Sequence, residues 1–320
     1  MRNKSLCLVG RQNIVFNEKV MSPRVAGESI VKIEACGICG SDRQEYKHGR
    51  IYWKSEDCGG HELVGTIVEI SSPEYGLSVG DFVCYCMPRM GSGISQGGGF
   101  SQYAVIKNDC LVKVCRTIRP EIAALIEPLA CAVHAMRFLK EEKNIAIIGS
   151  GAIALLLERA IYQMNIGQSN APDSKITLFY KHEIITKYLN NLTNAVSFYE
   201  SAFTKRLWDT FDIIYDCSGN EQAARWAMDR VADNGRVILL GIYRTEGVFF
   251  PLSSIMFGEK SVTGSFLYTR DDFLQAYRWI QKNSIMVEDM IQLWDISDCL
   301  AAFRQPSGNF LKSVLVWKGE

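Results

Sequence analysis

The sequence predicts an α/β protein with two domains, a β-rich barrel-like domain and a doubly wound parallel sheet. Short apolar runs separated by glycine and proline fill the first part of the chain, and strands alternate with helical segments from about residue 144. The chain then ends in a helix and one more apolar strand. We expect residues 1–133 to form the β-rich domain, 134–267 the parallel sheet, and 268–320 to return to the first domain.

The β-rich domain is predicted from apolar runs of strand length. Glycine and proline between these runs favour turns rather than helical continuation. The expected strands are 29–33, 63–70, 82–86 and 100–106.

The second domain is predicted from a strand at 145–148 that leads through glycines into a helix at 152–164. Strands that alternate with helices indicate a parallel sheet whose crossovers are helical. The returning segment is expected to contain a helix at 271–282 and a strand at 313–317 that completes the first domain. Later strands of the parallel sheet are expected at 176–180, 212–216, 236–241 and 261–266.

Composition excludes several classes of function. Lysine plus arginine and aspartate plus glutamate both number 35 in 320 residues, so the formal net charge is zero. No basic run is present that would follow a nucleic-acid backbone, and no apolar stretch is long enough to cross a bilayer. The 11 cysteines are scattered and odd in number, and the N-terminus lacks an export signal. We expect a reduced, cytoplasmic protein with no nucleic-acid or membrane partner.

A candidate metal site lies in two short runs, Cys36 to Asp42 and Gly60 to Glu62. Cys39 and His61 supply sulfur and nitrogen ligands that suit zinc, and one oxygen ligand would leave a coordination position open. Glu62 is adjacent to His61, whereas Glu127 is embedded in an apolar stretch where an unpaired charge is costly. Either carboxylate can complete the set, so both remain candidates.

A candidate dinucleotide site lies where the strand at 145–148 meets the next helix. Gly149 permits a tight turn, Gly151 lets the backbone approach a pyrophosphate, and Ala154 stands where a small residue allows close helix packing. A metal site and a dinucleotide site in one chain together suggest hydride transfer.

Five motifs occur in an order that resembles the zinc-dependent medium-chain alcohol dehydrogenases, most closely the polyol branch with sorbitol and threonine dehydrogenases. The resemblance implies a catalytic zinc domain followed by a Rossmann domain. It also implies zinc ligands at Cys39 and His61, with Glu62 or Glu127 binding the metal or its water, and Ser41 as the group that takes the alcohol proton. The motifs are GICGSD at 37–42, GHELVG at 60–65, GDFV at 80–83, EPLA at 127–130 and GSG at 149–151.

Three departures from the family pattern change the expectation. Cys84 and Cys86 are the only cysteines where many relatives carry a four-cysteine lobe, so we expect one catalytic zinc and no structural zinc. Gln44 replaces a relay histidine and cannot titrate, which leaves His48 or water to continue the proton route. Ser71 replaces a glycine or alanine and has little expected effect.

The cofactor prediction leans toward NADP, with NAD as the alternative. The second parallel strand ends at Tyr180 without the acidic residue that binds ribose hydroxyls in NAD enzymes, unless Glu183 reaches back. Lys181 follows and could pair with a 2′-phosphate. Cys217 ends a later strand of the same sheet and is a further candidate contact for the cofactor.

The predicted function is hydride transfer between NAD(P) and a secondary alcohol or ketone of a polyol, amino alcohol or cyclitol. Two alternatives are a zinc-free enone or quinone reductase and a dinucleotide-binding protein without catalysis. Tyr46, Trp53 and Phe266 are candidate pocket walls. The resemblance also suggests a homo-oligomer, dimer or tetramer, that pairs through strand 261–266.

Overall fold

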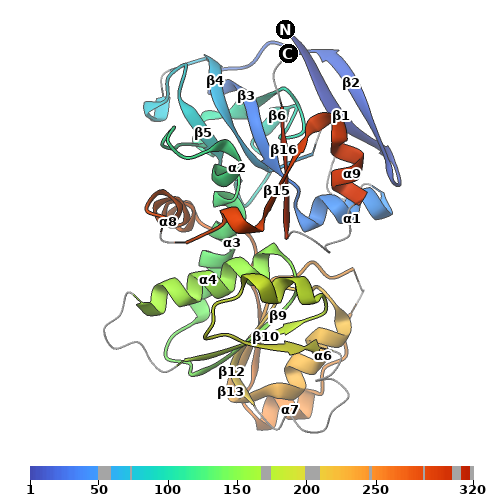
Figure 1. Ribbon diagram of the computed structural model, residues 1–320, viewed down its shortest axis with the longest axis vertical. Coiled ribbons are helices and arrows are strands. Elements are labelled where there is room, and N and C mark those ends of the chain that lie inside the picture. The colour runs from blue at the N-terminus through green and yellow to red at the C-terminus, as the bar shows by residue number, and fades with distance from the viewer. Residues whose placement is uncertain are drawn as a thin grey trace. The chain divides into compact units, whose positions relative to one another are not determined.

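The computed structural model divides the chain into two compact units, which are described separately (Figure 1). The β-rich unit contains Met1–Glu127, Thr269–Pro306 and Lys312–Glu320, and the parallel unit contains Pro128–Tyr268 and Ser307–Leu311. The structure describes residues 1–49, 59–72, 74–166, 174–198, 210–244, 247–283, 285–304 and 311–317.

The described part of the β-rich unit is built on an eight-stranded, mostly antiparallel sheet with the order β15-β16-β3-β4-β5-β8, in which β7 pairs with both β3 and β6. A separate hairpin joins β1 (Arg2–Gly10) to β2 (Asn13–Val20). The helices of the β-rich unit are α1 (Gly40–His48), α2 (Pro120–Ala123), α8 (Arg270–Gln281) and α9 (Cys299–Arg304). The sheet strands are β3 (Glu28–Gly37), β4 (Glu62–Ile70), β5 (Phe82–Tyr85), β6 (Ile94–Gln96), β7 (Tyr103–Lys107), β8 (Leu111–Lys113), β15 (Ile291–Asp295) and β16 (Lys312–Val316).

The C-terminal segment contributes strands β15 and β16 to this sheet. Strand β16 pairs antiparallel with β3, and β15 pairs parallel with β16. Arg43 on α1 binds the same segment through three hydrogen bonds. Its Nη1 donates to the carbonyl oxygens of Ala302 (2.8 Å) and Phe303 (2.9 Å), and its Nη2 donates to Ser313 Oγ (2.9 Å). Figure 1 shows α1 beside α9. Residues more than 250 positions apart therefore frame the same region.

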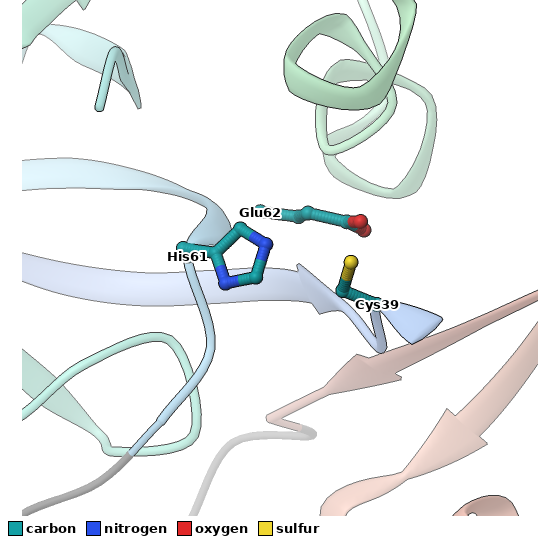
Figure 2. Close-up of side chains that lie close together, drawn as sticks. All are labelled: Cys39, His61 and Glu62. Carbon is teal, nitrogen blue, oxygen red and sulfur yellow. The ribbon is translucent and has the colours of Figure 1, made fainter. Parts of the chain in front are cut away.

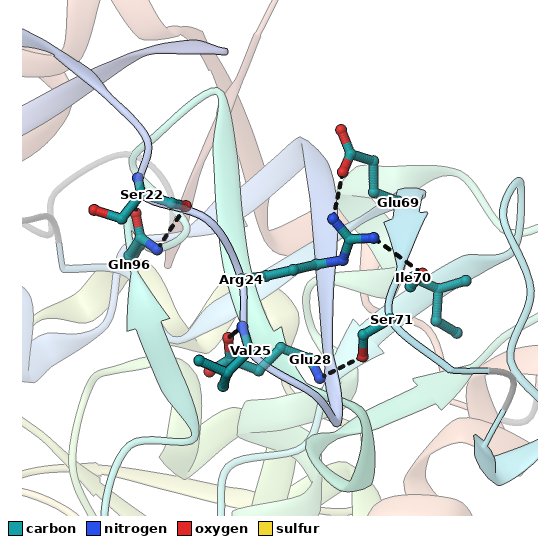
Figure 3. A network of polar contacts seen from close by, with 8 residues as sticks. All are labelled: Ser22, Arg24, Val25, Glu28, Glu69, Ile70, Ser71 and Gln96. Atoms are coloured by element: carbon teal, nitrogen blue, oxygen red, sulfur yellow. Dashed lines mark hydrogen bonds and ion pairs between the residues drawn. The ribbon is translucent and has the colours of Figure 1, made fainter.

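A polar network fixes the start of β3 against the end of β4 (Figure 3). Arg24 donates to Glu69 Oε2 (2.6 Å) and to the carbonyl oxygen of Ile70 (3.2 Å). The backbone N–H of Glu28 donates to Ser71 Oγ (3.0 Å), and the Ser71 N–H returns a bond to the Glu28 carbonyl (3.1 Å). The serine that departs from the family pattern thus supplies an acceptor that glycine or alanine lacks.

The described part of the parallel unit is a six-stranded sheet in the order β11-β10-β9-β12-β13-β14, with every pair parallel. This is the doubly wound order whose two halves diverge from the middle strands. Its helices are α4 (Ala152–Ile166), α6 (Glu221–Arg230) and α7 (Leu252–Phe257), and α3 (Ile126–Ala135) contains the boundary between the units. The strands are β9 (Asn144–Ile148), β10 (Lys175–Tyr180), β11 (Asn194–Ser197), β12 (Phe211–Asp216), β13 (Val231–Leu239) and β14 (Ser261–Gly264).

The two crossover helices lie on opposite faces of this sheet. The connection β9–α4–β10 runs one way from the centre and β12–α6–β13 runs the other way. Right-handed crossovers in opposite directions place α4 and α6 on opposite faces (Figure 1). Because all six described strands run parallel, their carboxyl ends lie at the same end of the sheet, which is where ligands bind in this fold.

Three predicted strands are shorter in the structure, and the one expected at 82–86 ends at Tyr85. The strand expected at 100–106 begins at Tyr103, because Phe100 is buried in the core against Phe303 while Ser101 makes only an isolated bridge to Ser5. The strand expected at 261–266 ends at Gly264. Among the described residues, none of the helices has the length and apolar character needed to cross a membrane.

Candidate functional site

The structure brings Cys39, His61 and Glu62 together (Figure 2). One ligand atom from each residue lies within 4.8 Å of the others. Cys39 caps the start of α1 just after β3, whereas His61 precedes β4 and Glu62 begins it. Because β3 and β4 are antiparallel with Gly37 opposite Glu62, these three side chains emerge at the same end of the sheet.

Asp42 positions the cysteine. Its Oδ2 accepts a hydrogen bond from the backbone N–H of Cys39 at 2.8 Å, which fixes the first turn of α1. Asp42 is fully buried, and burial raises the pKa of its carboxyl group. Its Oδ1 has no hydrogen-bond partner among the described residues. The proposed ligand and its support therefore belong to one local motif.

Glu62 is held by features distant in sequence. Its carboxylate lies over Gly37, where an added Cβ would be only 2.0 Å from Oε2. Lys312, the first residue of β16, forms a buried ion pair with this carboxylate, and the two side chains are 4% and 1% exposed. The Lys312 ammonium contacts both carboxylate oxygens of Glu62, so this ion pair holds the carboxylate beside Cys39 and His61.

The charges around His61 also favour a cation. Burial alone would lower the pKa of His61, but Cys39 in its charged form and the carboxylates of Asp42 and Glu127 raise the pKa well above its ordinary value. Burial alone would likewise lower the pKa of Lys312, but the charges of Glu62, Cys39 and Glu127 and the hydrogen bond to Glu62 together raise this pKa above its ordinary value. Sulfur, nitrogen and oxygen donors in a negatively charged, largely buried site fit a zinc ion.

Glu127 lies near this group without joining it. The residue is buried in the first turn of α3, and its charge acts on both His61 and Lys312. Among the described residues, the group with mutual distances below 4.8 Å contains Glu62 rather than Glu127. The role of Glu127 as a ligand stays a prediction.

The expected proton route begins at the start of α1. Ser41 is the second residue of this helix and is half-buried. Gln44 is exposed, and His48 lies seven residues beyond Ser41 in the last turn, about 10 Å further along the helix axis. Ser41 and His48 are therefore too far apart for a direct proton transfer.

One expected pocket wall is wrong. Tyr46 lies in the hydrophobic core, its ring 5.5 Å from that of Phe303, and its hydroxyl accepts a hydrogen bond from Arg304 Nε at 3.0 Å. Trp53 lies outside the described residues. Phe266 is an exposed residue of the parallel unit.

The glycine turn after β9 has the geometry of a dinucleotide site. Gly149 has a positive φ of 153°, and a Cβ there would lie 3.2 Å from the Cβ atoms of both Ala154 and Cys217. A Cβ at Gly151 would meet nothing within 4 Å, so the turn is open where a phosphate would approach. Ala154 is completely buried, as close packing of α4 requires.

A serine that the sequence analysis did not select ties this turn to the next loop. Ser150 Oγ accepts hydrogen bonds from the backbone N–H groups of Lys181 (2.7 Å) and His182 (3.0 Å). Lys181 and Tyr180 therefore stand beside the glycine turn at the carboxyl end of β10. The sequence signal that could have identified Ser150 is its place between two glycines of a turn of the phosphate-binding type.

Lys312 was also missed. It lies 250 residues after Glu62, and only its position as a lone charge at the start of an apolar strand marks it in the sequence.

Two protein-family models match parts of this chain. Residues 25–116 match the family described as "Alcohol dehydrogenase GroES-like domain", and residues 184–282 match "Zinc-binding dehydrogenase". An (R,R)-butanediol dehydrogenase of Saccharomyces cerevisiae is 25% identical over 346 residues, which cover 91% of this chain and 90% of the relative. A sorbitol dehydrogenase of Halalkalibacterium halodurans is 25% identical over 313 residues, covering 89% and 90%.

The fold is likewise shared with solved structures. The crystal structure of TarJ of S. aureus in complex with NADPH has a TM-score of 0.80 at 20% identity, with 100% of both chains covered. Both family matches and the near-complete coverage of the relatives agree with the arrangement of Cys39, His61 and Glu62. The chain therefore belongs to the zinc-dependent medium-chain alcohol dehydrogenase family, in its polyol branch.

Proposed function

We propose that this protein is a zinc-dependent oxidoreductase that transfers a hydride between NAD(P) and a secondary alcohol or ketone of a small polyol, amino alcohol or cyclitol. The convergence of Cys39, His61 and Glu62 carries this proposal. Three ligands, rather than a closed set of four, are typical of a catalytic zinc. The named activities of the relatives support the substrate class.

Cys39 and His61 would hold the metal, with Glu62 or Glu127 as the oxygen ligand. When bound, zinc lowers the pKa of an alcohol and polarises a carbonyl, and the nicotinamide exchanges the hydride. Ser41 would accept the alcohol proton. Because Gln44 cannot titrate and His48 lies a helix length away, water would take the proton from Ser41.

Gly149, Gly151 and Ala154 would receive the pyrophosphate, and Cys217 lies against the same turn. At the end of β10, Lys181 would pair with a 2′-phosphate, which supports a preference for NADP over NAD. Tyr180, at the end of the same strand, would border the adenosine.

The same proposal includes a single zinc. Cys84 and Cys86 are buried, and burial raises the pKa of both thiols, that of Cys86 to about 11. Two cysteines also do not complete the closed set of four ligands that a structural zinc requires. No disulfide bond joins the cysteines of the described residues, which supports a reducing, cytoplasmic environment.

We further infer a homo-oligomer. Helix α7 buries none of its residues, and Leu252, Met256 and Phe257 are 77%, 64% and 82% exposed. Strand β14 is an edge of the described parallel sheet. An exposed apolar helix beside an open edge favours a second copy as partner. Light scattering should show a multimer that Phe257→Asp dissociates; a monomeric wild type would contradict this part.

Metal content and cofactor titrations on the same freshly purified sample test the main proposal. We expect about one zinc per chain and tighter binding of NADPH than of NADH. Zinc-free protein that still binds a dinucleotide would overturn the metal mechanism and favour enone or quinone reduction. Bound zinc and dinucleotide without turnover on any alcohol or ketone would favour a non-catalytic binding protein.

A further inference from the structure

Asp216 is a buried carboxylate that the proposed metal and phosphate contacts do not use. It ends β12 and is fully buried. Its Oδ1 accepts hydrogen bonds from the Ser218 backbone N–H (2.8 Å) and hydroxyl (2.6 Å), and its Oδ2 accepts one from the Tyr243 hydroxyl (2.5 Å). Its main-chain carbonyl accepts from Leu240 (2.9 Å) and Gly241 (3.0 Å). One residue therefore binds the loops after β12 and after β13.

These two loops touch backbone to backbone. A Cβ on Gly241 would lie 2.0 Å from the Gly219 nitrogen, and a Cβ on Gly219 would lie 2.5 Å from the Ile242 carbonyl oxygen. No side chain fits between them. The relative position of the loops is consequently set by their glycines and by the hydrogen bonds to Asp216.

The loops lie on the ligand-binding edge of the sheet. Strand β12 neighbours β9, and Cys217 contacts the position where Gly149 would carry a Cβ. The strand order reverses between β9 and β12, and in this fold a dinucleotide spans that point with one mononucleotide on each half. With Lys181 on the half that contains β10, loops 217–220 and 240–243 are left for the other mononucleotide.

We propose that Asp216 and Tyr243 are a positioning pair that holds loops 217–220 and 240–243 in the shape that receives the nicotinamide half of the dinucleotide. The inference rests on the proposed dinucleotide binding and adds residues that the family motifs do not mark. Removing the phenol hydroxyl takes a donor away from Oδ2 of a fully buried carboxylate, which is costly unless the loops move to admit another donor. Such movement alters the receiving surface without any change in a ligand-contacting atom.

Tyr243→Phe tests the pair through two ligands. The first is NADPH or NADH, whichever the wild type binds more tightly, and the second is the corresponding ADP-ribose, with or without the 2′-phosphate, which lacks nicotinamide. We expect the variant to lose about tenfold in affinity for the complete dinucleotide. Affinity for the ADP-ribose should change by less than about twofold, since that half lies across β9 and β10.

Tyr215→Phe is the matched control. Tyr215 precedes Asp216 in the same strand and is buried, and its hydroxyl has no hydrogen-bond partner among the described residues. This variant should bind both ligands as the wild type does. Asp216→Asn keeps an acceptor for Ser218 and offers an amide to the Tyr243 oxygen, so it should retain more affinity than Tyr243→Phe.

Unchanged dinucleotide affinity in Tyr243→Phe would overturn the inference and leave the proposed function intact. Equal losses for both ligands would also overturn it, because they would indicate a general destabilisation of the unit. A wild-type protein that binds neither ligand would overturn the proposed dinucleotide binding itself, and the inference with it.

Discussion

The candidate metal centre and the candidate dinucleotide site are built by different means. At the metal centre, side chains converge from Cys39, His61 and Glu62, and a buried lysine balances their charge. At the candidate dinucleotide site, the receiving surface is mainly backbone. Gly149 and Gly151 suit it because they carry no side chain. A site made of charged side chains should therefore fail when a charge is removed. A site made of backbone should fail when volume is added.

The largest expected effect is that of Cys39→Ala. Loss of the sulfur ligand should abolish zinc retention and reduce kcat/KM on the order of 10⁴-fold, because the Lewis acid is lost. Dinucleotide affinity should not change, which separates the two sites. Metal analysis and steady-state kinetics measure these quantities, with Cys115→Ala as the control. Full zinc content in Cys39→Ala would show that Cys39 is not a ligand.

Lys312→Met sharpens the comparison by removing a charge without removing a ligand. In zinc-free protein the change leaves Glu62 buried and unpaired, and we expect the free energy of unfolding to fall by about 3–5 kcal/mol. Zinc should restore part of the loss by supplying another cation. Denaturant unfolding with and without zinc measures both values.

Lys113→Met provides the scale for that measurement. Lys113 also forms an ion pair, at 2.6 Å with Asp81, but its side chain is 59% exposed. Its removal should cost about 0–1 kcal/mol. Equal losses in the two lysine variants would mean that the buried pair has no special role.

Gly37→Ala tests added volume at the metal centre. The new Cβ would displace the Glu62 carboxylate, and we expect zinc affinity to fall about 10–100-fold, as for other residues that orient a metal ligand. Gly40→Ala is the matched control, because a Cβ there meets nothing within 4 Å. Competition with a chelator gives both affinities. Unchanged zinc affinity in Gly37→Ala would exclude Glu62 as a ligand.

Among the variants at the two candidate sites, Gly151→Ala gives the smallest expected effect, and it tests the dinucleotide site. No protein atom meets the added methyl group, so thermal stability should stay the same while dinucleotide affinity falls about tenfold, through contact with the phosphate alone. Titration of NADPH fluorescence and a melting curve measure the two quantities. A variant that binds NADPH normally would place the pyrophosphate elsewhere.

The sequence predicts what local spacing determines. Cys39 and Asp42 belong to one turn, and the apolar runs that follow His61 and precede Gly149 already indicate strands with one end at a site. Lys312 could not be predicted, because its contact with Glu62 depends on the pairing of β16 with β3. Such pairing is a property of the tertiary fold, which local patterns do not contain.

The errors have the same origin. Tyr46 follows the metal motif closely in sequence, but α1 turns that position toward the core, where Phe303 from the returning segment covers it. The hydrogen bond from Tyr243 to Asp216 was missed because it spans two crossover loops. In each case the deciding partner lies outside the window that a motif samples.

The buried pair of Glu62 and Lys312 has a consequence for biosynthesis. The ribosome adds Lys312 250 residues after Glu62, a delay of roughly 12–50 s at usual elongation rates, and the whole parallel unit is made in between. During that time the Glu62 carboxylate has no ammonium partner. The nascent β-rich unit therefore lacks both the charge of Lys312 and strand β16. A chain stalled before β16 would therefore be a substrate for chaperones and proteases rather than a smaller working enzyme.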